Sequence, residues 1–279
     1  MAELLKGAAV AAALAEASGK KAAELEARGV KPTLAIVRVG ENPDDIFYER
    51  SAGKKCAASG VAVRNVILPA DCEQAAALGA IESLNGDGSI HGVLILRPLP
   101  KHIDDDAIRN ALSPAKDVDG ITDASLAGVL TGKDSGFAPC TARACIETLD
   151  FYGIKPEGKR VVVVGRSLVV GKPLAMLLVN RHATVTICHT RTKGLPSVCR
   201  GAEILVAAAG RAGMIGREFL SEGQTVIDVG INVTENGVCG DVSGADEIAA
   251  AYTPVPGGIG TVTSALLVSH VVEAARRSL

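Results

Sequence analysis

A strand–turn–helix–strand unit in the second half of the chain constrains the fold most. After Gly158 the sequence reads GKRVVVVGRSLVVGKPLAMLLVNRHATVTICHTRT, a β-branched run, a glycine-bounded turn, an apolar helix and a second strand within about 30 residues. Gly165 allows the backbone to turn sharply out of the first strand. The free N–H groups at the start of the following helix favour a phosphate. The pattern therefore predicts a mononucleotide-binding βαβ unit in a parallel sheet.

This unit lacks the two best-known phosphate motifs. GxGxxG is absent, and a proline stands where a P-loop needs Ser or Thr, which excludes an NTPase of that type. Where an NAD site usually offers an acid to the ribose, the second strand ends in Cys-His-Thr-Arg. Arg166 and Arg191, with Ser167 and Thr190, are predicted to surround a 2′-phosphate, which favours NADP. The alternative is a structural turn with solvated arginines.

The rest of the chain alternates short β-branched runs with longer Ala- and Leu-rich stretches, the pattern of a parallel sheet covered by helices. The length of 279 residues favours about two α/β domains, with a boundary between the loop at 131–140 and the strand at 161. An amphipathic first helix is expected around Leu4, Leu5, Val10 and Leu14. The expected strands are 33–39, 61–67, 92–96, 161–164, 184–188, 203–207 and 225–229.

Composition excludes several classes of function. The net charge of −2 gives no basic excess for nucleic acid or an anionic membrane, and no apolar run is long enough to span a bilayer. The seven scattered cysteines contain no CxxC pair, which argues against a disulfide framework and a structural zinc site. We expect a cytoplasmic protein with reduced thiols and no metal.

A second candidate site lies in the N-terminal half. Tyr48 and Lys55 fall near one face of a predicted helix, about 10 Å apart along its axis, and a Lys of lowered pKa beside a Tyr can relay protons. The alternative is a solvated basic helix face. In KDVDG, Asp117 or Asp119 is suited to an NH–C–NH2 edge of a heterocycle, the alternative being an Asp-rich turn.

Taken together, these strings resemble the FolD-type methylenetetrahydrofolate dehydrogenase/methenyltetrahydrofolate cyclohydrolase family along nearly the whole chain. The resemblance implies a folate-side domain over 1–140, to which the last helix at 262–279 returns, and an NADP-binding Rossmann domain over 141–261. It also implies a cleft between the domains, a homodimer and a place in one-carbon metabolism. The matching strings are VGENP (39–43), PLPKHID (98–104), KDVDG (116–120), PCT (139–141), VVGRSLVVGKP (163–173), TVTICHTRT (184–192), DVGIN (228–232), GDV (240–242) and TPVPGGIGTVT (253–263).

The resemblance also assigns roles by matching position. Gly165, Arg166 and Ser167 would hold the NADP phosphates, and Thr190 would add a contact near the 2′-phosphate. On the folate side, Tyr48 would pack against the substrate and Asp119 would anchor the pterin. Ile231 would touch the cofactor, and Pro256, Gly257 and Gly258 would line the mouth of the cleft.

Two departures from the family pattern carry a functional prediction. The usual Lys four residues after the Tyr is Ala52, and the usual Gln before PLP is Leu96. Hydride transfer needs only positioning, whereas hydrolysis of the methenyl cation needs proton transfer. We therefore expect dehydrogenase activity with cyclohydrolase activity weak or lost.

Three alternatives stay open at this point. In the first, Lys55 or Lys54 replaces the lost Lys and both activities remain. In the second, the protein binds folate and NADP without catalysis. In the third, it is another NADP-linked dehydrogenase of small metabolites, for which His189 is the nearest acid/base candidate.

Overall fold

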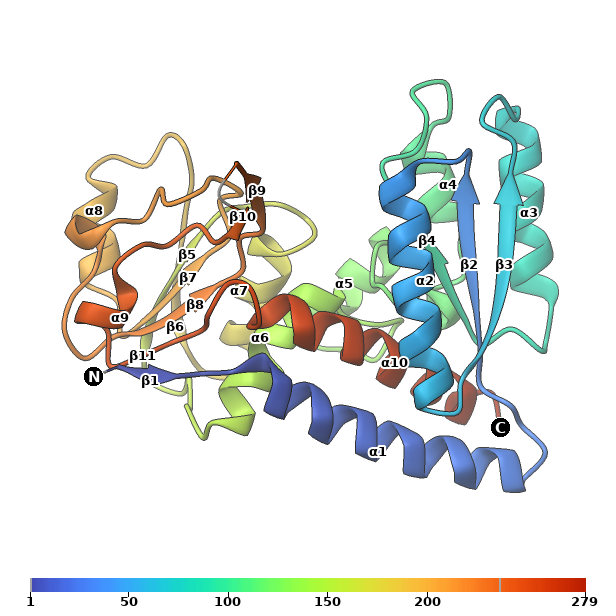
Figure 1. The fold of residues 1–279 in the computed structure, drawn as a ribbon, viewed down its shortest axis with the longest axis horizontal. Helices are drawn as coiled ribbons and strands as arrows, with labels where there is room; N and C mark the ends of the chain where they lie inside the picture. The colour runs from blue at the N-terminus through green and yellow to red at the C-terminus, as the bar shows by residue number, and fades with distance from the viewer. Residues whose placement is uncertain (1, 236) are drawn as a thin grey trace. The chain divides into compact units, whose positions relative to one another are not determined.

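The computed structural model describes residues 2–235 and 237–279, which form two compact units (Figure 1). One unit comprises the chain up to Ala12 together with Thr141–Thr263, and the other comprises Ala13–Cys140 with Ser264–Leu279. The N-terminal segment therefore groups with the later part of the chain, although the expected division placed all of 1–140 in one domain.

The first unit contains a six-stranded sheet in the order β1-β11-β8-β7-β5-β6, with every pair parallel. The chain runs from β5 to β6 on one side and then crosses to β7 on the other. This reversal creates a topological switch point, where open α/β sheets bind ligands. The strands are β1 (Glu3–Leu4), β5 (Arg160–Val164), β6 (Thr184–Cys188), β7 (Ile204–Ala207), β8 (Thr225–Asp228) and β11 (Ala251–Tyr252).

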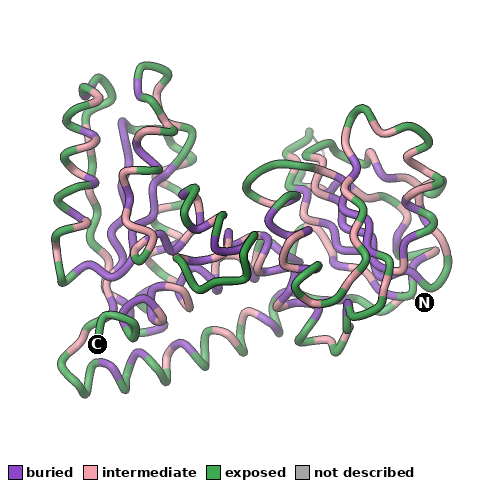
Figure 2. The backbone as a smooth tube through the Cα atoms, turned by 180° about the vertical axis from the view of Figure 1, so that it is seen from behind, coloured by how far each residue is buried: buried purple, intermediate pink, exposed green. Residues whose placement is uncertain are grey.

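The second unit contains a three-stranded parallel sheet in the order β3-β2-β4: β2 (Thr33–Val39), β3 (Ala62–Leu68) and β4 (Gly92–Ile95). Alternate residues of its central strand enter different hydrophobic clusters, as the period-2 geometry of a strand requires. Leu34 and Ile36 pack with Val271, whereas Ala35 and Val37 pack in the cluster of Ile81. The buried segments in Figure 2 include β2 and β4, whereas β3 is half-buried or exposed.

Helices and short elements complete the two units. An antiparallel hairpin is formed by β9 (Asn232–Thr234) and β10 (Gly237–Cys239). The helices are α1 (Gly7–Ala27), α2 (Pro43–Ala58), α3 (Gln74–Gly86), α4 (Asp105–Ala111), α5 (Asp123–Thr131), α6 (Cys140–Phe151), α7 (Gly171–Val179), α8 (Leu195–Arg200), α9 (Ala245–Ile248) and α10 (Ile259–Arg277), with 3-10 turns η1 (Pro114–Lys116) and η2 (Arg217–Phe219).

The seven strands expected from sequence are all present, each within one residue of its expected ends. The expected first helix is wrong at its start, because α1 begins only at Gly7. Before it, Glu3 and Leu4 pair with β11, and the Leu5 N–H donates to the carbonyl of Tyr252 at 2.8 Å. Within the described residues, the structure contains no helix long and apolar enough to cross a membrane.

Candidate functional site

A pocket of about 430 Å³ lies at the switch point of the six-stranded sheet. Its walls come from the segments that follow β5, β6 and β7. Four of the predicted cofactor residues meet here: Gly165, Arg166, Ser167 and Thr190. The carboxyl ends of parallel strands thus bring together residues that are 25 positions apart in sequence.

Two glycines allow the close approach of backbone that this pocket needs. Gly165 has a φ of +131°, and a Cβ at this position would collide with the carbonyl group of Ala208. A Cβ at Gly171, the first residue of α7, would collide with the carbonyl of Gly165. The helix therefore packs directly against the end of the strand, as it does in dinucleotide-binding units.

The charged groups of the pocket differ from the expected set. Arg166 lines it, but Arg191 is exposed and is not among the lining residues. Arg211, in the loop after β7, is a second arginine among the lining residues, which sequence analysis missed. The backbone N–H of Arg191 donates to Nδ1 of His189 at 3.1 Å. Guanidinium groups and a glycine-cradled turn are the donors that a dinucleotide phosphate requires, so this pocket fits the expected cofactor.

A second, smaller pocket of about 200 Å³ lies in the same unit. It is lined by Ile231, which follows β8, and by Pro256, Gly257 and Gly258 of the loop before α10. A Cβ at Gly258 would collide with the carbonyl of Pro254, so this loop folds tightly on itself. The structure thus brings together residues assigned separately to cofactor and substrate.

In the other unit, Tyr48 and Asp119 are brought together with Cys140. Tyr48 is 40% exposed, and its pKa is raised by burial and by the nearby Asp119, Cys140 and Cys56. The pKa of Asp119 is raised to about 7 overall. Burial and the charge of Asp117 raise it, and a hydrogen bond from the Cys140 thiol and the charge of Arg97 offset part of this rise. This is the shift expected of a carboxyl group held for a ligand in a partly apolar site.

The structure distinguishes the two carboxylates of KDVDG. Asp117 is fully buried and accepts hydrogen bonds from Ile121 N, Thr122 N and Ser125 Oγ, so its role is to fix the start of α5. Asp119 makes none of these bonds. A Cβ at Gly120 would meet the backbone of residues 137–139, which holds Asp119 against the PCT segment. Asp119 is therefore the one suited to a ligand.

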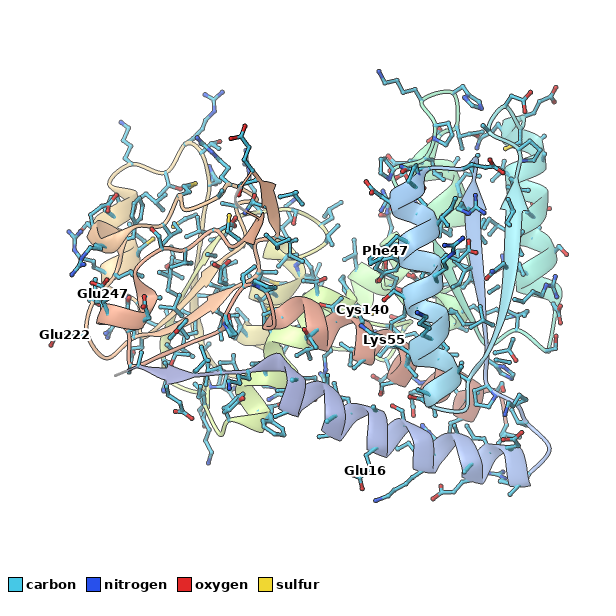
Figure 3. All side chains as sticks on the ribbon, viewed as in Figure 1. Glu16, Phe47, Lys55, Cys140, Glu222 and Glu247 are labelled. Atoms are coloured by element: carbon cyan, nitrogen blue, oxygen red, sulfur yellow. The ribbon has the colours of Figure 1, made fainter. Side chains whose placement is uncertain are left out.

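The two departures from the family pattern lie in one apolar cluster. Ala52 is 8% exposed and Leu96 is 6% exposed, and both pack in the cluster that contains Cys56 and Cys140. Lys55 lies one turn further along α2, half-buried, with a pKa lowered by burial (Figure 3). The position of the usual Lys thus carries no proton-transfer group and faces hydrophobic neighbours.

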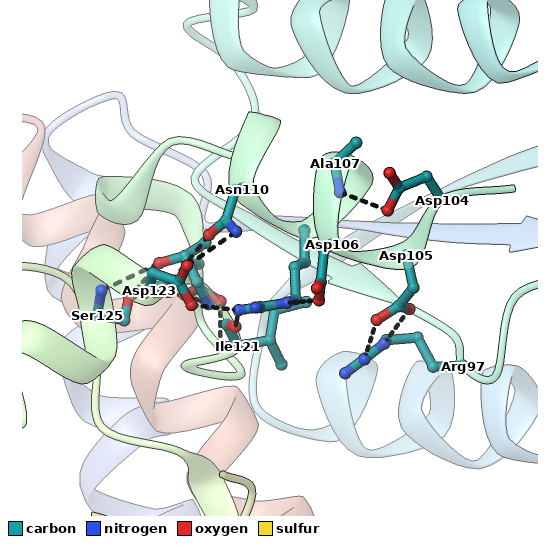
Figure 4. Close-up of polar contacts among 12 residues, drawn as sticks. Arg97, Asp104, Asp105, Asp106, Ala107, Asn110, Ile121, Asp123 and Ser125 are labelled. Carbon is teal, nitrogen blue, oxygen red and sulfur yellow. Dashed lines mark hydrogen bonds and ion pairs between the residues drawn. The ribbon is translucent and has the colours of Figure 1, made fainter.

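Arg97 follows Leu96 and holds the turn into α4. Its guanidinium makes a two-pronged ion pair with Asp105, including a bond from Nε at 2.6 Å (Figure 4). Asp104 caps α4 by accepting a hydrogen bond from Ala107 N at 3.1 Å. Because Arg97 also lowers the pKa of Asp119, it supplies positive charge to this side of the site.

Among the described residues, no group of three or more His, Cys, Asp or Glu side chains could hold a metal ion. All seven cysteines are free thiols, and six of them are buried.

Comparison with known proteins shows the family to which the chain belongs. Residues 5–119 match the model of the tetrahydrofolate dehydrogenase/cyclohydrolase catalytic domain, and residues 139–279 match that of the corresponding NAD(P)-binding domain. The bifunctional protein FolD of Carboxydothermus hydrogenoformans is 47% identical over 98% of this chain and 97% of its own.

Solved structures agree with these matches. The bifunctional FolD methylenetetrahydrofolate dehydrogenase/cyclohydrolase of Campylobacter jejuni superposes with a TM-score of 0.97 and 37% identity, covering 100% of both chains. The Trypanosoma brucei FolD, solved with NADP and an inhibitor, has a TM-score of 0.91 and 35% identity, covering 99% of this chain and 98% of its own.

Proposed function

Because the chain belongs to the tetrahydrofolate dehydrogenase/cyclohydrolase family, we propose that it oxidises 5,10-methylenetetrahydrofolate to 5,10-methenyltetrahydrofolate with NADP+ and hydrolyses the product weakly or not at all. The observation that carries the second half is the apolar cluster around Ala52 and Leu96. It places methyl and isobutyl groups where the family pattern has an amine and an amide.

The cofactor supplies the hydride acceptor when bound, and the chain's task in this step is positioning. Hydride transfer needs aligned donor and acceptor carbons but no protein acid or base. Gly165, Arg166 and Ser167 would hold the phosphates, with Thr190 and Arg211 as further pocket residues. The two guanidinium groups support NADP over NAD, because they match the charge of a 2′-phosphate.

On the folate side, Tyr48 would pack against the substrate and Asp119 would accept hydrogen bonds from the pterin NH–C–NH2 edge. An ionised carboxylate accepts two such bonds in parallel. The substrate would contact Pro256, Gly257 and Gly258, and the cofactor would contact Ile231. All four residues line one pocket.

Hydrolysis of the methenyl cation makes a different demand, because a water must lose a proton while the ring nitrogen gains one. Tyr48 is a poor base at neutral pH, since burial and nearby groups raise its pKa. Lys55 is the nearest candidate substitute, because burial lowers its pKa, but it lies three positions after the family's Lys site.

The test is the decay of supplied 5,10-methenyltetrahydrofolate with and without the purified protein. We expect a rate within about twofold of the spontaneous one, while the same preparation reduces NADP+. Lys55→Ala and the matched variant Lys54→Ala should leave both rates unchanged. A rapid hydrolysis that Lys55→Ala abolishes would mean that the protein is fully bifunctional, with Lys55 in place of the usual Lys.

We also propose that the protein is a cytoplasmic homodimer. The buried free thiols are in keeping with a reducing compartment. Light scattering should give twice the mass of one chain at micromolar concentration, and a monomer mass there would contradict the dimer.

A further inference from the structure

Two buried carboxylates lie behind the loop that follows β7. The Asp241 side chain is fully buried and accepts hydrogen bonds from three successive backbone N–H groups. Its Oδ2 accepts from Ala209 N at 2.6 Å and Gly210 N at 2.9 Å, and its Oδ1 accepts from Arg211 N at 2.8 Å. Successive N–H groups that converge in this way form an anion-binding nest, and here a carboxylate of the same chain fills it.

The loop that Asp241 holds is a wall of the nucleotide pocket. Ala208, Ala209 and Arg211 all line that pocket. The carbonyl of Ala208 also lies where a Cβ of residue 165 would be, so the loop packs directly on the phosphate-binding turn. A shift of this loop would move a pocket guanidinium and open the contact with Gly165.

Asp241 is itself fixed by its neighbours. Its N–H donates to Oδ1 of Asp228 at 3.0 Å, and Asn232 Nδ2 donates to its Oδ1 at 3.0 Å. Asp228, 5% exposed at the end of β8, also accepts from Gly230 N and Val242 N, each at 2.9 Å. Hydrogen bonds thus connect the end of β8 to Asp241 through Asp228, and Asp241 to the 209–211 loop.

Two glycines pack against the carboxylates of Asp228 and Asp241 without room for a side chain. A Cβ at Gly230 would collide with the Asp241 carboxylate, and a Cβ at Gly240 would collide with that of Asp228. The two carboxylates are thus buried and tightly packed, and all their oxygen atoms accept hydrogen bonds. Such an arrangement tolerates little movement.

We propose that Asp241 is a positioning residue for nucleotide binding. Its carboxylate holds the 209–211 loop, and with it Arg211, in the binding geometry before the cofactor arrives, so less ordering remains to be done on binding. It also occupies the three N–H groups, which leaves the cofactor's phosphates to the guanidinium groups and the Gly165 turn. This role rests on the nucleotide site of the proposed function.

The test compares Asp241→Asn with the matched control Asp246→Asn, an exposed carboxylate on α9. The side chain of the Asp241→Asn variant has only one acceptor oxygen, and its NH2 group faces backbone N–H groups that need an acceptor. The 209–211 loop therefore loses hydrogen bonds and becomes less rigid. We expect the Kd for NADPH, measured by fluorescence titration, to rise about tenfold or more. The kcat at saturating NADP+ and the KM for folate should stay within about threefold, and hydrogen exchange at 209–211 without nucleotide should accelerate.

An Asp241→Asn protein with wild-type NADPH affinity and wild-type exchange at 209–211 would overturn the proposal, as would equal losses in every kinetic parameter. If this variant fails to fold, Asn232→Ala removes one hydrogen bond from the same carboxylate, and an unchanged Kd there would also overturn it. Wild-type protein that binds no NADPH would instead contradict the proposed function, and the exchange measurement without nucleotide would still test the loop.

Discussion

The Asp119 carboxyl group has a pKa near the working pH of most enzymes. Burial and Asp117 raise this pKa to about 7, so the group is largely protonated below neutrality. An ionised carboxylate is the form that accepts two hydrogen bonds from a pterin edge. We therefore predict that kcat/KM for methylenetetrahydrofolate falls as the pH drops below 7, by up to about tenfold per unit.

Asp119→Asn should remove this pH dependence and lower kcat/KM for the folate by about 10- to 100-fold at pH 8, because an amide offers only one acceptor. The control is Asp71→Asn, an exposed carboxylate of the same unit. A variant at residue 119 that kept the wild-type pH profile would assign that profile to another group.

Of the two arginines predicted to bind phosphate, Arg166 lines the nucleotide pocket. Replacing it by Gln removes a charge-assisted hydrogen bond of about 1.5–3 kcal/mol, so KM for NADP+ should rise about 10- to 100-fold with little change in KM for the folate. Arg160→Gln is the control, because Arg160 is an exposed arginine at the start of β5. Equal behaviour of the two variants would remove Arg166 from the cofactor site.

The placement of pocket residues was predictable where a local sequence pattern determines it, and it was not predictable where it depends on backbone that is distant in sequence. Gly165 and Arg166 follow a recognisable strand and turn. For Arg211 no local pattern indicates a place in the pocket, and GDV (240–242) does not indicate that Asp241 contacts the 209–211 loop. Both placements arise only when β8, β7 and β5 lie side by side in this order in one sheet. Arg191 is next to Thr190 in sequence but is not among the residues that line the pocket, so its contact with the 2′-phosphate stays a prediction.

At the scale of elements, the junction of β5, its turn and α7 determines the nucleotide pocket. We predict that Gly165→Ala abolishes measurable NADPH binding and lowers the melting temperature, because its Cβ would meet the Ala208 carbonyl and its φ is +131°. Gly158→Ala is the control: its φ is +72°, but its Cβ would meet no atom within 4 Å.

The control separates backbone strain from collision. Strain alone should cost Gly158→Ala about 1 kcal/mol of unfolding free energy and leave NADPH affinity unchanged. Equal losses of stability in the two variants, with binding retained in both, would show that the pocket does not need the close contact at Gly165.

Most elements follow from hydrophobic patterning, because a strand of four to seven residues buried on both faces leaves a continuous β-branched run. β1, β9, β10 and β11 have only two or three residues each, too few for a pattern. For the same reason the sequence of β1 predicts the start of a helix, since Leu4 and Leu5 fit a helical spacing as well as an extended one.

The two compact units carry separate sets of predicted ligand residues, and the two departures that bear on hydrolysis lie in the folate-side set. The nucleotide pocket keeps its glycines and a guanidinium, whereas the folate-side set keeps Tyr48 and Asp119 but has Ala52 and Leu96 within an apolar cluster. Comparison of the chain's motifs with the family pattern revealed those two departures. Their burial in a common cluster required the fold.

The central claim, oxidation without hydrolysis, is tested most directly by the ratio of methenyltetrahydrofolate to NADPH formed from methylenetetrahydrofolate and NADP+. We predict that the two products appear one for one and that the methenyl compound then decays only at its enzyme-free rate. A persistent deficit of methenyltetrahydrofolate, matched by 10-formyltetrahydrofolate that accumulates in proportion to enzyme, would contradict it.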